Sequence, residues 1–291
     1  MQIPSLDRLS TWLAAREAQV LGLEPDVCKR IIWASGQAEI SDLSIVYVHG
    51  FSASSEELRP FPDDLARGLS ANLYFSRLAG HGQEGSSLGR ATLAEWHKDS
   101  LETLNIGRTL GKRVVVIACS TGVPLVLRAL AEKPEAIAAC IFVSPNFGLA
   151  HRGTNLMLQL PWVRQWGPLI MGRTLEFESR SEGHEKYWTT RYDVQAIYTM
   201  MEAVRAAAKL DLFTFSVPLA TLFCPEDQVV SPKKIRMALQ RWGGPWETLE
   251  MDKGCDPSGH LLVGTVMNPE QTDVATDFAL NFCRRYLGNH Q

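Results

Sequence analysis

Long apolar runs are missing from this chain of 291 residues. No stretch of about 18 uncharged apolar residues occurs, and a membrane-spanning helix would need one. The first twenty residues carry Asp7, Arg8, Arg16 and Glu17 where a signal peptide would need an unbroken apolar stretch. We therefore expect no membrane segment and no export, which places the protein in the cytoplasm.

Paired cysteines and clustered positive charge are also lacking. The six cysteines form no C-x-x-C pair, which argues against a zinc site, and several lie in apolar stretches where a free thiol packs as a small hydrophobic group. The net charge is −3, and no run of Lys or Arg offers a track for phosphates. We expect no metal, no nucleic-acid partner and a small molecule as the ligand.

Short apolar runs are present at wide intervals and alternate with amphipathic stretches. The runs cover residues 43–48, 72–76, 113–117, 138–143 and 219–224, with a further candidate at 247–251. Stretches with helical spacing cover 57–69, 93–110, 124–132, 232–242 and 273–286. This alternation predicts an α/β fold whose mostly parallel central sheet has helices on both faces.

Residues 148–212 interrupt this alternation. A segment rich in Leu, Trp and Met is followed by a helical pattern of Val194, Ile197, Met201, Val204 and Ala208. We expect a core made of residues 1–147 and 213–291, with 148–212 inserted as a helical cap over the strand ends. An ordinary helical excursion that packs on the core is the alternative, and the two interpretations are compatible.

A serine follows the apolar run 113–117 directly, in the sequence VVVIACSTG. Small residues surround Ser120, and a helical stretch begins at once, which is typical of the strand-turn-helix that exposes a nucleophilic serine. Gly122 would let the helix pass close to the strand, whereas Ala118 replaces the glycine usual at the start of this motif. A simple turn is the alternative interpretation.

A serine nucleophile needs a base, and the base needs an orienting acid. In this architecture the acid and then the histidine follow the serine along the chain. Asp227 lies directly after the run 219–224 and His260 lies in a late loop, so the expected order is Ser120, Asp227, His260. Glu226 and Asp256 remain alternative acids. The other histidines lack the order or the loop setting expected of the base: His49, His81, His97, His151, His184 and His290.

Negative charge that develops on a carbonyl oxygen needs hydrogen-bond donors. The amide of Thr121 lies just after the serine at the start of a helix, where N–H groups are unpaired. The amide of Phe51, after the run 43–48, is the second expected donor. His49 beside it fits a structural hydrogen-bonding role better than that of a base.

With these features the sequence resembles the α/β-hydrolase superfamily, and within it the carboxylesterase and monoacylglycerol-lipase-like group. The resemblance rests on VYVHGFSAS (46–54), RLAGHG (77–82), TLAEWHKDSLETL (92–104), VVVIACSTG (114–122), PEDQVVSP (225–232) and SGH (258–260). It implies the α/β-hydrolase fold, a catalytic triad of Ser120, Asp227 and His260, oxyanion donors at Phe51 and Thr121, and no cofactor. Departures from the family pattern are Ala118, Val123, and Arg77, which stands where relatives commonly have an Asp.

The expected reaction is hydrolysis of a carboxylic ester with an apolar acyl group, of short or medium length or monoacylglycerol-like. Apolar residues of the insertion are candidates for an acyl pocket or, equally, for packing of the insertion on the core: Leu156, Met157, Leu158, Leu160, Trp162, Trp166, Leu169 and Met171. Alternatives are C–C bond, amide or lactone hydrolysis, or a non-catalytic binding member of the fold.

Overall fold

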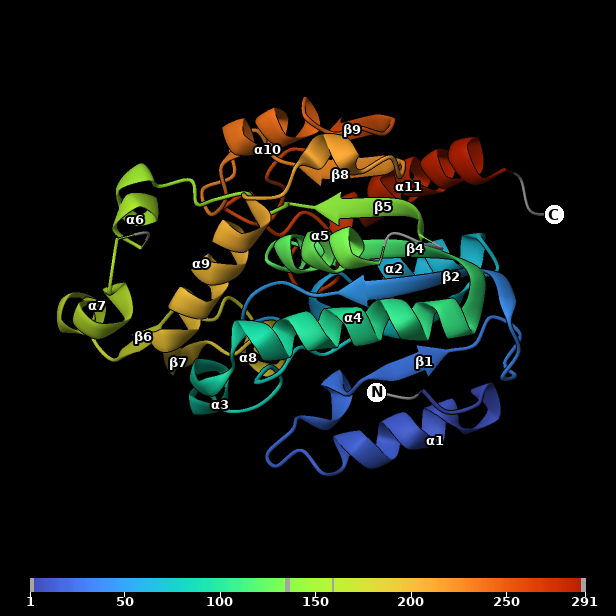
Figure 1. Ribbon diagram of the computed structural model, residues 1–291, viewed down its shortest axis with the longest axis horizontal. Coiled ribbons are helices and arrows are strands. Elements are labelled where there is room, and N and C mark those ends of the chain that lie inside the picture. Colours follow the sequence, from blue (N-terminus) through green and yellow to red (C-terminus); the bar gives the residue numbers. More distant parts are fainter. Residues whose placement is uncertain (1–2, 134–136, 159, 289–291) are drawn as a thin grey trace.

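A sheet of seven strands forms the centre of the computed structural model, which describes residues 3–133, 137–158 and 160–288 (Figure 1). The strand order is β1-β3-β2-β4-β5-β8-β9. The strands are β1 (Arg30–Ile32), β2 (Ser41–Val48), β3 (Asn72–Phe75), β4 (Gly111–Cys119), β5 (Ile137–Val143), β8 (Leu219–Phe223) and β9 (Trp246–Glu250). Only β1 pairs antiparallel with its neighbour, so the predicted α/β fold with a mostly parallel sheet is confirmed.

Side chains of the inner strands alternate between two apolar layers. In β4, Val114 and Val116 contact one layer, and Val115 and Ile117 contact the other. Helices α4 (Leu93–Leu110) and α5 (Gly122–Glu132) supply the first layer, and α2 (Phe61–Gly68) and α11 (Thr272–Leu287) supply the second. Coverage of both faces explains why these strands read as continuous apolar runs.

The predicted helix 57–69 is shorter than expected. Residues Ser55–Glu57 form a separate 3-10 turn, and α2 begins only at Phe61. Pro60 lies between the two, and a proline disfavours helical conformation in the residue before it. Glu57 is thereby detached from α2 and belongs to the loop that follows β2.

The segment 148–212, which we call the cap segment, lies between β5 and β8 in the chain. It contains α6 (Arg152–Met157), α7 (Val163–Met171), α8 (Glu182–Tyr187), α9 (Gln195–Ala207) and a hairpin of β6 (Thr174–Glu176) and β7 (Arg191–Asp193). Helix α9 packs on α5 and on α3 (Gly85–Arg90), whereas α6 and α7 lie away from the sheet (Figure 1).

Two further helices complete the described chain. Helix α1 (Leu6–Glu17) lies beside the β1 edge, and α10 (Pro232–Leu239) lies between β8 and β9 in the sequence. Among the described residues, no helix combines the length and the apolar character that a membrane crossing requires.

Candidate active site

Ser120 lies in the turn between β4 and α5. Its φ angle is 46°, in the left-handed region that residues other than glycine rarely adopt. The Ser120 amide donates to the Val143 carbonyl at 2.9 Å, and the Ser120 carbonyl accepts from the Asn146 amide at 3.1 Å. A Cβ atom on Gly122 would lie 2.5 Å from the Val48 carbonyl oxygen, so only glycine lets α5 start here.

The structure brings the three predicted triad residues together. His260 Nε2 lies 3.0 Å from Ser120 Oγ, and His260 Nδ1 lies 2.8 Å from Asp227 Oδ2. The other oxygen of Asp227 accepts hydrogen bonds from the amides of Val229 and Val230, at 2.7 and 2.9 Å. Asp227 is therefore held by its own turn, with one oxygen directed at the imidazole.

The electrostatic surroundings of His260 favour its protonated form. Burial of the ring opposes protonation, but the charge and hydrogen bond of Asp227, together with smaller contributions from Glu57 and Asp256, outweigh burial, so the pKa of His260 is raised above 6.5. The Nδ1 proton is shared with Asp227, which leaves Nε2 of the neutral ring free to accept a proton from the serine.

The two alternative acids have other contacts. Glu226 is largely exposed and pairs with Lys253 at 2.9 Å. Asp256 Oδ2 accepts from the backbone amides of His260 and Leu261, at 2.9 and 2.8 Å, and Oδ1 pairs with Arg180 of the cap segment. Although burial opposes its ionisation, hydrogen bonds from Ser258 and from these partners lower the pKa of Asp256 to about 2. Asp256 thus supports the loop that carries His260 and does not contact the ring.

The remaining histidines lie outside this arrangement, with one partial exception. His49 is buried and bonds through both ring nitrogens, to the Gly50 carbonyl and from the Leu78 amide, and burial lowers its pKa to about 4. His184 lines the same cavity as Ser120, yet its Nδ1 accepts from the Arg180 amide. The others make separate contacts or, at position 290, fall outside the described residues: His81, His97, His151 and His290.

The two predicted oxyanion donors line the same cavity as Ser120. Phe51 follows β2 and Thr121 follows Ser120, and both line the cavity that holds the Ser120 hydroxyl. No hydrogen bond joins either amide to another group in the described part of the chain. The next amide, that of Ser52, donates to His81 Nε2 at 3.2 Å, which fixes the loop that carries Phe51.

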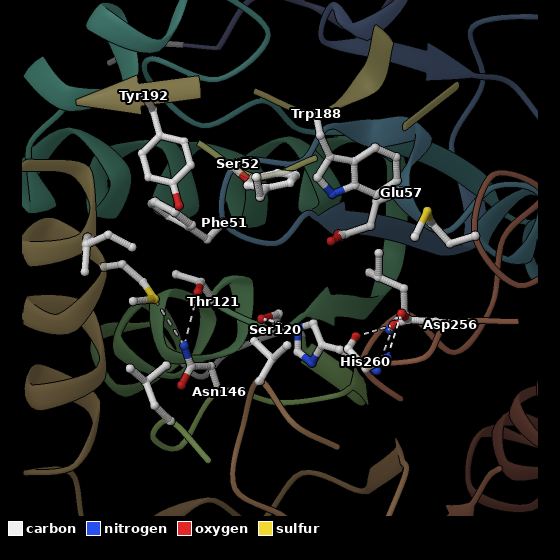
Figure 2. A pocket seen from close by; sticks show the side chains of 18 of the residues that line it. Phe51, Ser52, Glu57, Ser120, Thr121, Asn146, Trp188, Tyr192, Asp256 and His260 are labelled. Atoms are coloured by element: carbon white, nitrogen blue, oxygen red, sulfur yellow. Dashed lines mark hydrogen bonds between the residues drawn. The ribbon is translucent and has the colours of Figure 1, made fainter. Parts of the chain in front are cut away.

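A cavity of about 350 Å³ lies over Ser120, between the carboxyl ends of the strands and the cap segment. Figure 2 shows Phe51, Tyr192 and Trp188 above Ser120 and His260, and Thr121 and Asn146 beside them. Ligands of parallel α/β sheets bind at this strand edge. Among the described residues, no group of three His, Cys, Asp or Glu side chains is placed to hold a metal ion.

The predicted apolar pocket residues divide into three sets. Leu158 and Met171 line the cavity, and Met157 and Trp166 pack against the core. The other four are exposed: Leu156, Leu160, Trp162 and Leu169. Composition identified the segment that contributes to the cavity, but the side of each helix that faces it depends on packing.

Two polar side chains at the site, those of Asn146 and Glu57, were not predicted from the sequence. Asn146 donates to the Thr121 hydroxyl at 3.3 Å, and Glu57, only 2% exposed, reaches the cavity from the loop after β2. Glu57 follows the HG dipeptide closely, but nothing in the sequence distinguishes a buried carboxylate there from an exposed one.

Comparisons with solved structures find the same fold at low sequence identity. A structure from work on LipS and LipT, two metagenome-derived lipolytic enzymes, is 18% identical with a TM-score of 0.72, covering 90% of this chain and 99% of that one. The monoacylglycerol lipase of Paleococcus ferrophilus is 15% identical, with a TM-score of 0.61 and coverage of 87% and 98%. Est1E from Butyrivibrio proteoclasticus with bound ferulic acid is 14% identical, with a TM-score of 0.60 and coverage of 90% and 95%.

Comparisons of the sequence itself identify the family. No curated protein sequence is significantly similar to the chain. The model of the alpha/beta hydrolase family, however, matches residues 45–272. This range runs from within β2 to beyond β9 and includes the cap segment, Ser120, Asp227 and His260. The chain therefore belongs to the alpha/beta hydrolase family.

Proposed function

We propose that this protein is a serine hydrolase that cleaves carboxylic esters through an acyl-enzyme on Ser120. The observation that carries the proposal is the continuous contact from Asp227 through His260 to Ser120, with distances of 2.8 and 3.0 Å, at the wall of a largely apolar cavity. His260 acts as base and acid, and Asp227 holds its tautomer.

The reaction proceeds in two halves. As Ser120 Oγ attacks the ester carbonyl carbon, its proton passes to His260 Nε2, and the carbonyl oxygen becomes an oxyanion beside the Phe51 and Thr121 amides. One such donor contributes about 3 kcal/mol to transition-state stabilisation. His260 then protonates the leaving alcohol as the C–O bond breaks. Water, deprotonated by His260, attacks the acyl-enzyme in the same way and releases the acid and Ser120.

The proposed substrate is an ester with an apolar acyl group of short or medium length. A cavity of about 350 Å³ with apolar walls suits such a chain. Among similar structures, one comes from work on lipolytic enzymes, one is a monoacylglycerol lipase and one holds ferulic acid. We further propose that residues 1–147 and 213–291 form the catalytic core and that 148–212 act as its cap, because the cap segment supplies much of the cavity wall.

A fluorophosphonate probe and a panel of p-nitrophenyl esters of graded chain length test this function. The folded protein should be labelled on Ser120 and should hydrolyse the esters. Ser120→Ala should abolish both, a loss of at least about 10³-fold, because the nucleophile is removed. Ser35→Ala, at an exposed loop position, is the matched control and should behave as wild type. Folded wild-type protein that resists labelling and cleaves none of the esters would contradict the proposal.

A further inference from the structure

The carboxylate of Glu57 lines the cavity and has no part in the proposed reaction. Glu57 ends the 3-10 turn after the loop that carries Phe51, and its side chain lines the cavity with Ser120 and His260 (Figure 2). In the described part of the chain, no Lys or Arg pairs with it within 4 Å. Burying an acid without a cationic partner costs free energy, so its hydrogen bonds have to replace the lost hydration.

One oxygen of Glu57 is held from the protein side. Its Oε2 atom accepts hydrogen bonds from the Tyr47 hydroxyl and from the Gly50 amide, both at 2.7 Å. The Cys119 thiol also lies against the carboxylate, and a thiol is a weak donor. Both strong donors therefore serve Oε2, and Oε1 retains the capacity to bond with a group in the cavity.

Oε1 of Glu57 lies against the loop that carries Phe51. A Cβ atom built on Gly50 would lie 2.6 Å from Oε1, so this oxygen rests against the backbone one residue before the proposed oxyanion donor Phe51. Burial raises the pKa of Glu57, and after the stronger effects of burial and Asp227, the charge of Glu57 contributes to the raised pKa of His260. Glu57 is thus electrostatically coupled to the imidazole that must protonate the leaving alcohol.

The cavity differs on the two sides of Ser120. Figure 2 shows Glu57 and Trp188 on the side of His260 and Asp256, and Thr121 and Asn146 on the opposite side. The Asn146 side is bounded by the side chain of Met200, whose sulfur lies 3.4 Å from Asn146 Nδ2. The side that holds Glu57 therefore offers a carboxylate where the other offers a hydroxyl, an amide and a thioether, and an ester placed across Ser120 has its two parts on different surfaces.

We propose that Glu57 recognises a hydroxyl group on the alcohol part of the ester, so that the protein selects esters of polyols over esters of simple alcohols. This inference rests on the proposed ester hydrolysis. A hydroxyl suits Oε1 in either protonation state of Glu57, because an O–H group donates to a carboxylate and accepts from a protonated acid. The alcohol part lies on this side because His260 delivers its proton to the alcohol oxygen.

The test compares two esters that differ only in hydroxyl groups, 1-monobutyrin and propyl butyrate. We expect wild-type kcat/KM to be about tenfold higher for 1-monobutyrin, since the net contribution of one hydrogen bond corresponds to about that factor. Glu57→Gln keeps an acceptor for Tyr47 and Gly50 and a weaker partner for the hydroxyl, so it should reduce the preference to about threefold. Glu57→Met removes both oxygens and should abolish it. The readout is the ratio of the two kcat/KM values, which a general loss of activity does not change.

Glu56→Gln is the matched control, because Glu56 is the adjacent carboxylate but pairs with Arg30 and Arg59 away from the cavity. It should leave the ratio unchanged. Equal kcat/KM ratios in wild type and both Glu57 variants would overturn the inference. Wild-type protein that cleaves both esters without preference would overturn it as well, and this second result needs no variant to fold. Both of these outcomes leave ester hydrolysis standing, whereas a folded wild type that cleaves neither ester and resists the fluorophosphonate overturns both proposals.

Discussion

In the proposed mechanism the imidazole of His260 has to be neutral to take the Ser120 proton, so we expect its ionisation to set the acid limit of activity. Because Asp227 raises its pKa above 6.5 in spite of burial, kcat/KM for an uncharged ester should fall as the pH drops through a midpoint above 6.5 and should level off at higher pH.

Asp227→Asn should lower kcat by on the order of 10³-fold or more, because the tautomer of His260 is no longer fixed. It should also shift the remaining acid limb to lower pH, because the carboxylate that favours the imidazolium is gone. A pH profile of kcat/KM measures both effects. An acid limb that stays in place in Asp227→Asn would contradict the assignment of the acid.

Asp256 illustrates how a residue near His260 can act on stability. Its pKa of about 2 lies below its ordinary value of 3.8, so its charge stabilises the fold above pH 4, and this contribution disappears as the pH falls from 4 towards 2. Asp256→Asn should reduce the free energy of unfolding by on the order of 2 kcal/mol at neutral pH, and by less at pH 3. Urea denaturation at the two pH values measures this. An equal loss at both would show that the charge is irrelevant.

Glu17 and Arg77 connect the first helix to the sheet. Arg77 lies in the loop after β3 and forms two hydrogen bonds to the Glu17 carboxylate at the end of α1, at 2.7 and 2.9 Å, with both side chains buried. Glu17 also accepts from the Lys29 amide, at the entrance to β1. Arg77, which departs from the family pattern, therefore has a structural role in holding α1 and β1 on the sheet edge.

Glu17→Ala should lower the free energy of unfolding by about 3–5 kcal/mol, because the buried guanidinium of Arg77 is left without its counter-charge. The double variant Glu17→Leu with Arg77→Leu should lose less than Glu17→Ala, since neither member of this ion pair is left buried without the other. Chemical denaturation of the three proteins checks this order. A double variant that is as unstable as Glu17→Ala would mean that the ion pair is not the cause.

The elements themselves were predicted unevenly. The six predicted strands are present within one or two residues, because each is a run of apolar side chains that both faces of the sheet bury. β1 was missed, since Arg30–Ile32 is too short and too exposed to produce a pattern. The helix expected from residue 57 begins at Phe61, because the conformational restriction imposed by Pro60 outweighs the helical spacing.

The cavity is a property of the whole molecule, since its walls come from the loops after β2, β4, β5, β8 and β9 and from the cap segment. Ile197 projects from α9 of the cap segment into this space. Its volume should limit the acyl chains that can bind.

Ile197→Trp should reduce kcat/KM for an octanoate ester by about tenfold or more while changing that for an acetate ester little, because added bulk fills space that only the longer chain needs. Ala208→Trp adds a larger side chain at an exposed position just beyond α9 and should leave the chain-length profile unchanged. A p-nitrophenyl ester series measures the profile. Equal losses for acetate and octanoate in Ile197→Trp would contradict this placement of the acyl chain.

The sequence by itself determined the six parallel strands of the sheet, the alternation of strands and helices along the chain, and the residues that meet at Ser120. Those features depend on local properties: apolar runs, a tight turn of small residues, and an acid and a histidine in loops after strands. Only the tertiary structure decided that Glu57 is buried beside His260, that Asp256 binds backbone rather than the ring, and which cap side chains face the cavity. Each of these features depends on contacts between segments that are distant in the chain. The free energy of such a contact depends on both partners, so the local sequence around either residue does not predict it.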